Sequence, residues 1–276
     1  MILDEGRRWW KVRLRLVIVA LCFVVGCTAT AEPHPPVRLE MAGSTSMKSL
    51  LEELAEAYSV RHDYVSIDIQ ARGTRLGLDA LRDGATDIAL VSRDLTPDED
   101  ESLVGAAIAY DAIAILVNDQ NPVRSLTSAQ VRDIFSGRIL LWSEVGGEEA
   151  EIQVVSREDG SGTRDAFEGA LMQEHRVTLM AIVVPDDGAL GRFIAEEPLA
   201  IGYGSPVGVP AGVRAVRIDD VAPEPEAVDQ DRYPLIRPFI LATREDADDE
   251  VKAFVDFTLS PAGQAIVGKR YGRARQ

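Results

Sequence analysis

The stretch Ser156-Arg157-Glu158-Asp159-Gly160-Ser161-Gly162-Thr163-Arg164 combines arginine, small hydroxyl side chains and two glycines within one turn. An apolar run at 152–155 precedes it and predicts a buried strand, and residues 165–172 repeat apolar side chains at helical spacing. Glycines let the backbone approach a ligand closely, and the first N–H groups of a helix attract an anion. Arg157 can grip two oxygens of a tetrahedral oxyanion. The stretch therefore predicts an anion site, although a capped helix beside a solvated arginine is the simpler interpretation of it alone.

Three further polar turns follow predicted strands earlier in the chain. Residues 37–41, 65–70 and 87–91 have the short apolar patterns of strands. The turns after them hold Gly43-Ser44-Thr45-Ser46, Gly73-Thr74 and Ser92-Arg93, and the first two lead into predicted helices at 47–60 and 78–82. Strands that alternate with helices predict an α/β fold with mainly parallel sheets, whose ligands lie beyond the carboxyl ends of the strands.

The composition predicts a globular protein with an acidic surface. The chain has 276 residues, 46% of them hydrophobic, which suits one large or two medium domains. Its formal net charge is −16. An anion would meet repulsion at long range, so an anion site must depend on backbone donors and local arginines. The same charge argues against nucleic acid or an anionic membrane surface as a partner.

The N-terminus has the pattern of an exported lipoprotein. Basic residues precede an apolar run at 16–26, which is short for a membrane span but typical of a signal peptide. The run ends in Val24-Val25-Gly26-Cys27, which resembles a bacterial lipoprotein cleavage box. We expect residues 1–26 to be a signal peptide, Cys27 to carry lipid such as palmitate and residues 27–36 to be a tether, with an uncleaved anchor as the alternative. The protein would then lie in the periplasm or at the cell surface, anchored to the membrane. No disulfide would form, because the other cysteine is removed.

The rest of the chain continues the alternation of strands and helices. The longest apolar run, 106–117, predicts a strand that crosses between two lobes. Further predicted strands lie at 177–185, 199–203, 213–218 and 234–243, the last interrupted by Pro238. Predicted helices lie at 96–102, 127–135, 249–259 and 261–269, and an acidic loop is expected at 222–231.

The order and spacing of these motifs resemble the phosphate-binding proteins of bacterial ABC phosphate importers, which have the type II periplasmic binding protein fold. The resemblance covers residues 38–272. The motifs that carry it are Gly43-Ser44-Thr45, residues 87–93, Val117-Asn118, Asn121-Pro122-Val123, residues 134–137 with Trp142, residues 156–164, residues 200–203, Tyr233-Pro234-Leu235 with Arg237-Pro238, and Leu259-Ser260-Pro261 with Gly263-Gln264. Each motif is weak alone, and their order together makes the resemblance specific.

This resemblance implies two α/β lobes joined by hinge strands, with phosphate in a cleft between them. We place the first lobe at 37–115 with 206–276 and the second at 116–205. The expected phosphate-binding residues are Ser44, Thr45, Ser46, Thr74 and Ser92 from the first lobe and Arg157, Ser161, Gly162 and Thr163 from the second. Many sites of this kind also hold a carboxylate that accepts the phosphate proton, and Asp94, Glu158 and Asp159 are the open candidates. The resemblance further implies a monomer without cofactor or metal that delivers phosphate to ABC permease subunits.

Two other classes of protein remain open at this point. One is a binding protein that senses phosphate or another tetrahedral oxyanion without serving a permease. The other is a serine hydrolase that uses Ser161, but the nucleophile elbow has the pattern G-x-S-x-G, whereas Ser161 has glycine on both sides. His34, His62 and His175 have the contexts of surface histidines rather than of a general base. The sequence has neither a retained cysteine pair nor the histidine spacing of a metal site.

Overall fold

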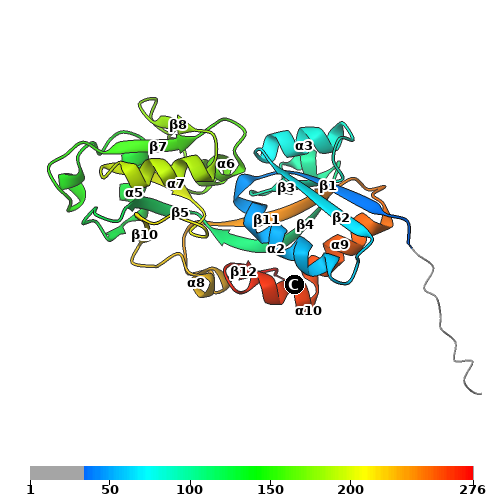
Figure 1. Ribbon diagram of the computed structural model, residues 1–276. Coiled ribbons are helices and arrows are strands. Elements are labelled where there is room, and N and C mark those ends of the chain that lie inside the picture. Colours follow the sequence, from blue (N-terminus) through cyan, green and yellow to red (C-terminus); the bar gives the residue numbers. More distant parts are fainter. Residues whose placement is uncertain (1–33, 276) are drawn as a thin grey trace, which may run out of the picture. The chain divides into compact units, whose positions relative to one another are not determined.

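Two six-stranded sheets organise residues 34–275, which are the residues that the computed structural model describes (Figure 1). The first sheet has the strand order β12-β4-β11-β3-β1-β2, and the second has the order β6-β10-β5-β9-β7-β8. Both sheets mix parallel and antiparallel pairs, so the expectation of mainly parallel sheets was only partly right. The predicted signal peptide and Cys27 lie outside the described residues.

The first sheet is covered on both faces by helices. Its strands are β1 (Val37–Gly43), β2 (Val65–Ala71), β3 (Ile88–Val91), β4 (Val104–Ala112), β11 (Ile236–Thr243) and β12 (Gly272–Arg273). Its helices are α2 (Lys48–Ser59), α3 (Thr74–Arg82), α9 (Asp249–Leu259) and α10 (Pro261–Val267), with a short turn α4 (Pro97–Asp100). On one face of the sheet, Ile88 and Leu90 pack in an apolar cluster with α2 and α9. On the other face, Ala89 and Val91 pack with Leu78 of α3. Burial on both faces explains why β3 is an unbroken apolar run.

Helices also cover both faces of the second sheet. Its strands are β5 (Ala114–Asn118), β6 (Ser125–Leu126), β7 (Gln153–Arg157), β8 (Ile182–Val184), β9 (Ala200–Gly204) and β10 (Val213–Ile218). Its helices are α5 (Ser128–Phe135), α6 (Gly162–Phe167) and α7 (Asp187–Glu196), and its shorter helical turns are η2 (Trp142–Val145) and the π-helical η3 (Glu168–Met172). In the first lobe, η1 (Thr45–Met47) follows β1, and α8 (Pro225–Asp229) lies against β4 and β12. Ile115 and Val117 face the core of α5 and α6, while Leu116 faces α7.

The long apolar run does cross between the two sheets, but as two strands. β4 ends at Ala112 in the first sheet and β5 begins at Ala114 in the second. Between them, Ile113 donates its N–H to the carbonyl of Leu235 at 2.8 Å. The predicted second lobe ended at residue 205, whereas β10 pairs with β5 and β6 and so belongs to the second sheet. Residues beyond a lobe's expected end can return to its sheet, because an antiparallel neighbour only has to run back along an existing strand.

Three local predictions need correction. No helix was predicted at 187–196, where α7 starts with the Asp186 side chain accepting from the Ala189 N–H at 2.6 Å. The expected acidic loop at 222–231 contains α8, with Pro225 in its first turn. Pro238 does not interrupt β11, because β3 pairs only with residues 240–242 and a bulge follows Pro238. Within residues 34–275, no helix has both the length and the apolar character needed to cross a bilayer.

Candidate anion-binding site

Four of the predicted residues form one buried cluster of hydroxyl groups in the first lobe. The Ser44 hydroxyl donates to Ser92 Oγ at 2.8 Å and lies 2.9 Å from Ser46 Oγ. Ser92 Oγ lies 3.4 Å from Thr74 Oγ1, which also accepts from the Ser92 N–H. Thr74 and Ser92 are fully buried. The polar turns after β1, β2 and β3 thus meet at the carboxyl ends of their parallel strands, as the sequence predicts.

Gly162, at the start of α6 in the second lobe, lies directly against this cluster. A β-carbon added there would lie 2.3 Å from Thr74 Oγ1 and 2.6 Å from Ser92 Oγ, so only glycine fits. The first N–H groups of a helix have no partners within it, and those of α6 begin at this point. The two lobes therefore bring hydroxyls and the start of a helix to one place.

Arg157 lies beside this contact at the end of β7 and is surrounded by carboxylates. Its side chain is 1% exposed. Nε and Nη2 donate to Glu158 at 3.1 and 3.2 Å, and Nη1 donates to Asp187 at 2.6 Å. Burial works to lower the pKa of Arg157, but the charge of Asp187 and the hydrogen bond to Glu158 outweigh it and raise the pKa above its usual value. The guanidinium therefore stays charged, and Arg157, Glu158 and Asp187 together carry a formal charge of −1.

Thr45 connects the two lobes through Asp187. The Thr45 hydroxyl donates to Asp187 Oδ2 at 2.7 Å and accepts from Arg157 Nη2 at 3.4 Å. Thr45 belongs to the turn after β1, and Asp187 is the first residue of α7. An anion that accepts from Thr45 and Arg157 would therefore share its donors with Asp187.

Thr163 is held by a buried ion pair at the crossing between the sheets. Arg237 Nη1 donates to Thr163 Oγ1, and Arg237 Nη2 donates to Asp111 at 2.8 Å. Both charged side chains are at most 2% exposed. Ser205 completes the group by donating to Asp111 at 3.1 Å. Because the Thr163 Oγ1 accepts from Arg237, its own hydrogen is free to point elsewhere.

The strand below the turn is fixed by Tyr203. Its hydroxyl lies 2.7 Å from Ser156 Oγ, and its ring stacks on Phe167 of α6 with centroids 4.0 Å apart. Burial raises the pKa of Tyr203 to about 12, so the hydroxyl remains a donor at neutral pH. The carboxyl ends of β7 and α6 are therefore held by the same aromatic side chain.

Ser161 serves as the N-cap of α6. Its Oγ accepts from the Arg164 N–H at 3.4 Å, and the side chain is buried. The His62 ring stacks on Tyr58 and bonds the Tyr58 carbonyl, in the first lobe. Neither it nor the His175 ring bonds to Ser161 among the described residues, so the arrangement of a base beside a nucleophile is not seen in this part of the chain.

The three candidate carboxylates occupy different environments. Asp94 is exposed, and Asp159 is 90% exposed and pairs with Arg164 at 2.7 Å. Glu158 accepts a hydrogen bond from Arg157 Nε at 3.1 Å. The carboxylate that joins Thr45 of the first lobe to Arg157 of the second is instead Asp187, which sequence reasoning missed. Its signal was the strand, polar turn and helix at 182–190, the same pattern as the four turns that were recognised.

Further bonds between the lobes surround the site. The Arg75 N–H donates to the Gly160 carbonyl at 3.2 Å. Arg93 donates to Asp165 at 3.1 Å and to Glu99 at 2.8 Å. Glu99 is nearly buried, and although burial works to raise its pKa, Arg93 and the Thr96 N–H lower the pKa below its usual value. Arg93 and Arg237 lie in motifs that the sequence analysis names, but the pairing of Arg237 with Asp111 and of Arg93 with Asp165 was not predicted, because each pair joins residues far apart in the sequence.

Comparisons with known proteins show the family to which the chain belongs. The family model of the PBP superfamily domain matches residues 30–262. The phosphate-binding protein PstS of Bacillus subtilis is 30% identical over 244 residues, covering 84% of this chain and 79% of that protein. Phosphate-binding protein PstS 2 of Streptococcus pneumoniae is 40% identical over 126 residues, which cover 45% of this chain and only 43% of the relative.

Solved structures show the same architecture. A protein from Clostridium perfringens with bound phosphate, described as a phosphate ABC transporter substrate-binding protein, has a TM-score of 0.83 at 37% identity, covering 86% of this chain and 100% of that one. An ABC-type phosphate transport receptor from Vibrio cholerae has a TM-score of 0.70 at 32% identity, covering 85% and 99%. The two-lobed α/β fold predicted from the sequence is thereby confirmed. The chain therefore belongs to the PBP superfamily and, within it, to the family of the phosphate-binding protein PstS.

Proposed function

We propose that this chain binds inorganic phosphate between its two lobes. The observation that carries the proposal is the contact of Gly162 with Thr74 and Ser92, which brings hydroxyl donors of one lobe to the helix start of the other. Arg157 adds a charged fork beside them. The names of the PstS relatives and the phosphate in the Clostridium perfringens structure support phosphate as the anion.

The charge of the site suits an anion that brings its own proton. Arg157 is balanced by Glu158 and Asp187, so phosphate would be held mainly by neutral donors. We propose that Ser44, Thr45, Ser46, Thr74, Ser92, Arg157, Ser161, Gly162 and Thr163 make up this site. Neutral donors arranged in advance can bind an anion tightly in a protein of formal charge −16, because they act at short range.

Calorimetry of the full chain with phosphate, sulfate, molybdate and arsenate tests the proposal. We expect saturable phosphate binding, and we expect Gly162→Ala to abolish it because the added methyl group would collide with Thr74 and Ser92. Gly169→Ala serves as a control for adding a methyl group, since its β-carbon would meet nothing within 4 Å and its φ is not in the left-handed region. Absence of phosphate binding by the folded wild-type protein would refute the function.

We further propose that the protein delivers phosphate to ABC permease subunits as a membrane-anchored monomer outside the cytoplasm, with a purely binding or sensing role as the alternative. The relatives' descriptions as ABC transporter proteins support transport, and the Val24-Val25-Gly26-Cys27 motif supports an anchor at Cys27. Fatty-acid labelling should mark the wild type and not Cys27→Ala. Phosphate uptake in cells that lack this protein should fall, and unchanged uptake would favour the sensing role.

A further inference from the structure

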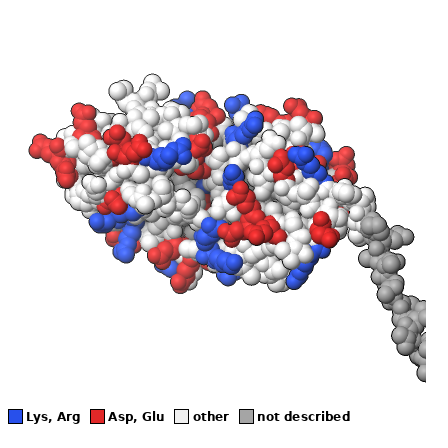
Figure 2. Space-filling model, in the orientation of Figure 1, with Lys and Arg blue, Asp and Glu red and all other residues white. Residues whose placement is uncertain are grey.

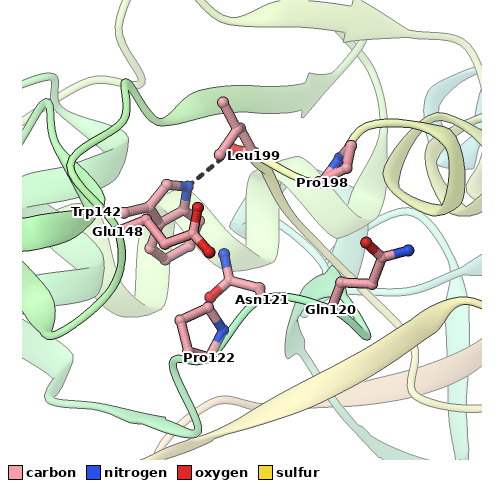
Figure 3. A pocket seen from close by; sticks show the side chains of 7 residues that line it. All are labelled: Gln120, Asn121, Pro122, Trp142, Glu148, Pro198 and Leu199. Carbon is pink, nitrogen blue, oxygen red and sulfur yellow. Dashed lines mark hydrogen bonds between the residues drawn. The ribbon is translucent and has the colours of Figure 1, made fainter.

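A pocket in the second lobe lies apart from the anion site. It encloses about 170 Å³ and is lined by residues 120–122, Trp142, Glu148 and the Pro198-Leu199 pair (Figure 3). Leu199 immediately precedes β9, whereas the Asp187 carboxylate lies beside Gly204, at the other end of that five-residue strand. The two ends are roughly 13 Å apart at about 3.4 Å per residue. The pocket is therefore a separate site.

Asn121 supplies an unpaired hydrogen-bond donor to this pocket. The residue is only 4% exposed, and its Oδ1 accepts from the Val123 N–H at 3.0 Å, which fixes the orientation of the carboxamide. Its Nδ2 has no hydrogen-bond partner within residues 34–275, and Figure 3 shows it on the side that faces Glu148 and Trp142. A ligand with an acceptor oxygen would satisfy this donor.

The apolar side chains of the pocket are already fixed in place. Trp142 is 1% exposed, and its Nε1 donates to the Leu199 carbonyl at 3.0 Å. Pro122 and Pro198 stand on either side with restricted backbones. A cavity of about 150 Å³ holds a benzene molecule, so this pocket has room for one apolar side chain.

The rim of the pocket carries unpaired negative charge. The Glu148 carboxylate lines the pocket, is exposed and has no ion-pair partner in the described part of the chain. Exposed carboxylates lie near the lining residues at Glu149, Glu151, Glu196 and Glu197, again without an ion-pair partner among residues 34–275. Figure 2 shows acidic side chains gathered at the left end of the second lobe. The Arg214 guanidinium also lies close by, but its Nη2 donates to the backbone carbonyls of Asn121 and Val123. The carboxylates around the pocket outnumber this cation, so a cationic group is favoured here.

We propose that this pocket binds the amino-terminal residue of a peptide. The α-ammonium group would pair with Glu148, the first carbonyl would accept from Asn121 Nδ2, and an apolar side chain would fill the space beside Trp142. An amino-terminal residue fits because it carries a cation and an acceptor oxygen next to each other, and Glu148 and Asn121 line one small pocket. The proposal does not depend on phosphate binding.

Fluorescence of Trp142 provides the test. The sequence has three tryptophans, so the full chain with Trp9→Phe and Trp10→Phe has Trp142 alone. We expect leucyl-glycinamide to change this fluorescence saturably, and N-acetyl-leucyl-glycinamide, which lacks the cation, to have no effect. The response should fade as the pH rises through about 8, where an α-amino group loses its proton.

Matched variants identify the groups involved. Glu148→Gln should weaken binding about tenfold, as expected for one charge-assisted hydrogen bond, whereas Glu149→Gln makes the same change of charge outside the lining and should have little effect. Asn121→Ala should also weaken binding, with thermal unfolding followed by circular dichroism as the check on folding. The proposal is wrong if leucyl-glycinamide gives no saturable change up to about 10 mM, a very weak affinity. The proposal is also wrong if the acetylated peptide changes the fluorescence as much as leucyl-glycinamide does, or if Glu148→Gln binds leucyl-glycinamide as tightly as the wild type.

Discussion

Replacing Asp187 by asparagine tests whether the carboxylate that bridges the lobes selects the charge of the anion. Asp187 Oδ2 lies 2.7 Å from Thr45 Oγ1, and Oδ1 lies 2.6 Å from Arg157 Nη1. An anion that shares these donors would lie on the order of 5 Å from the carboxylate, given ordinary hydrogen-bond lengths. With an effective dielectric constant of about 20, two unit charges at that distance repel by roughly 3 kcal/mol. Since the Asp187 side chain is 25% exposed, solvent screening reduces this to about 1–2 kcal/mol per charge.

Sulfate and phosphate should respond differently to the loss of this charge. Sulfate is doubly charged without a proton, so it meets the full repulsion in the wild type. Phosphate carries a proton near neutral pH and can donate it to Asp187. We expect Asp187→Asn to strengthen sulfate binding by roughly tenfold or more, which corresponds to about 1.4 kcal/mol, and to change phosphate binding by less than about threefold. The preference for phosphate should therefore fall by about tenfold.

Calorimetry with both anions measures this preference directly. Asp159→Asn is the matched control, because it removes the same charge from the loop beside Arg157 while its side chain is 90% exposed and pairs with Arg164. We expect the control to leave the preference within about twofold, because an exposed charge is screened by water. The reasoning fails if Asp187→Asn keeps the wild-type preference, or if Asp159→Asn shifts it equally.

Three further predictions concern the polar groups around the site. Arg157→Ala should weaken phosphate and sulfate alike, by roughly 2 kcal/mol or more, because a charge-assisted fork recognises any tetrahedral oxyanion, and unequal losses in calorimetry would contradict this. Ser92→Ala should weaken phosphate by about 1–2 kcal/mol and reduce the phosphate-to-sulfate ratio, since Ser92 can accept as well as donate, and unchanged affinities would exclude Ser92 from the site. The pKa of Glu99 lies below its usual value near 4.5, so its contribution to stability is present above that pH and is lost as the pH falls through the lower folded value. Thermal unfolding of Glu99→Gln should accordingly change less than the wild type between about pH 5 and 3, and parallel curves would rule out this role.

Most of the fold was predictable from local patterns. The strand at 88–91 and the helix around Leu50, Leu51 and Leu54 follow from apolar periodicity, which reports burial directly. α7 was missed because its start, Asp186-Asp187-Gly188, has the composition of a turn, and the capping role of Asp186 depends on the backbone that follows. The position of β10 was also beyond local reasoning, since only tertiary pairing assigns a strand to a sheet.

The site likewise contains residues that the local sequence predicts and residues that it does not. The composition of the turn at 156–164 predicts an anion site, because glycine, small hydroxyls and arginine are the residues that hold an anion. The local sequence does not predict the roles of Asp187 and Arg237, because each acts across a long sequence separation. Asp187 accepts from Thr45, and Arg237 donates to Thr163. A single carboxylate or arginine in a sequence has many structural uses, and only its neighbours in space give it a role at the site.

The bonds between the lobes are of a kind that would let the site open. Around Gly162 the lobes are joined by polar contacts: Thr45 with Asp187, Arg93 with Asp165, and the Arg75 N–H with the Gly160 carbonyl. Each such bond contributes on the order of 1 kcal/mol net, because water replaces it when the lobes separate. The large apolar clusters instead lie away from Gly162, one around α2 and α9 and the other around α5 and α6, where it extends to Ala112 of β4 at the crossing between the sheets. Separation at Gly162 would thus exchange a few hydrogen bonds with water while the cores stay intact, and phosphate, by adding donors and acceptors that both lobes share, would favour the closed arrangement.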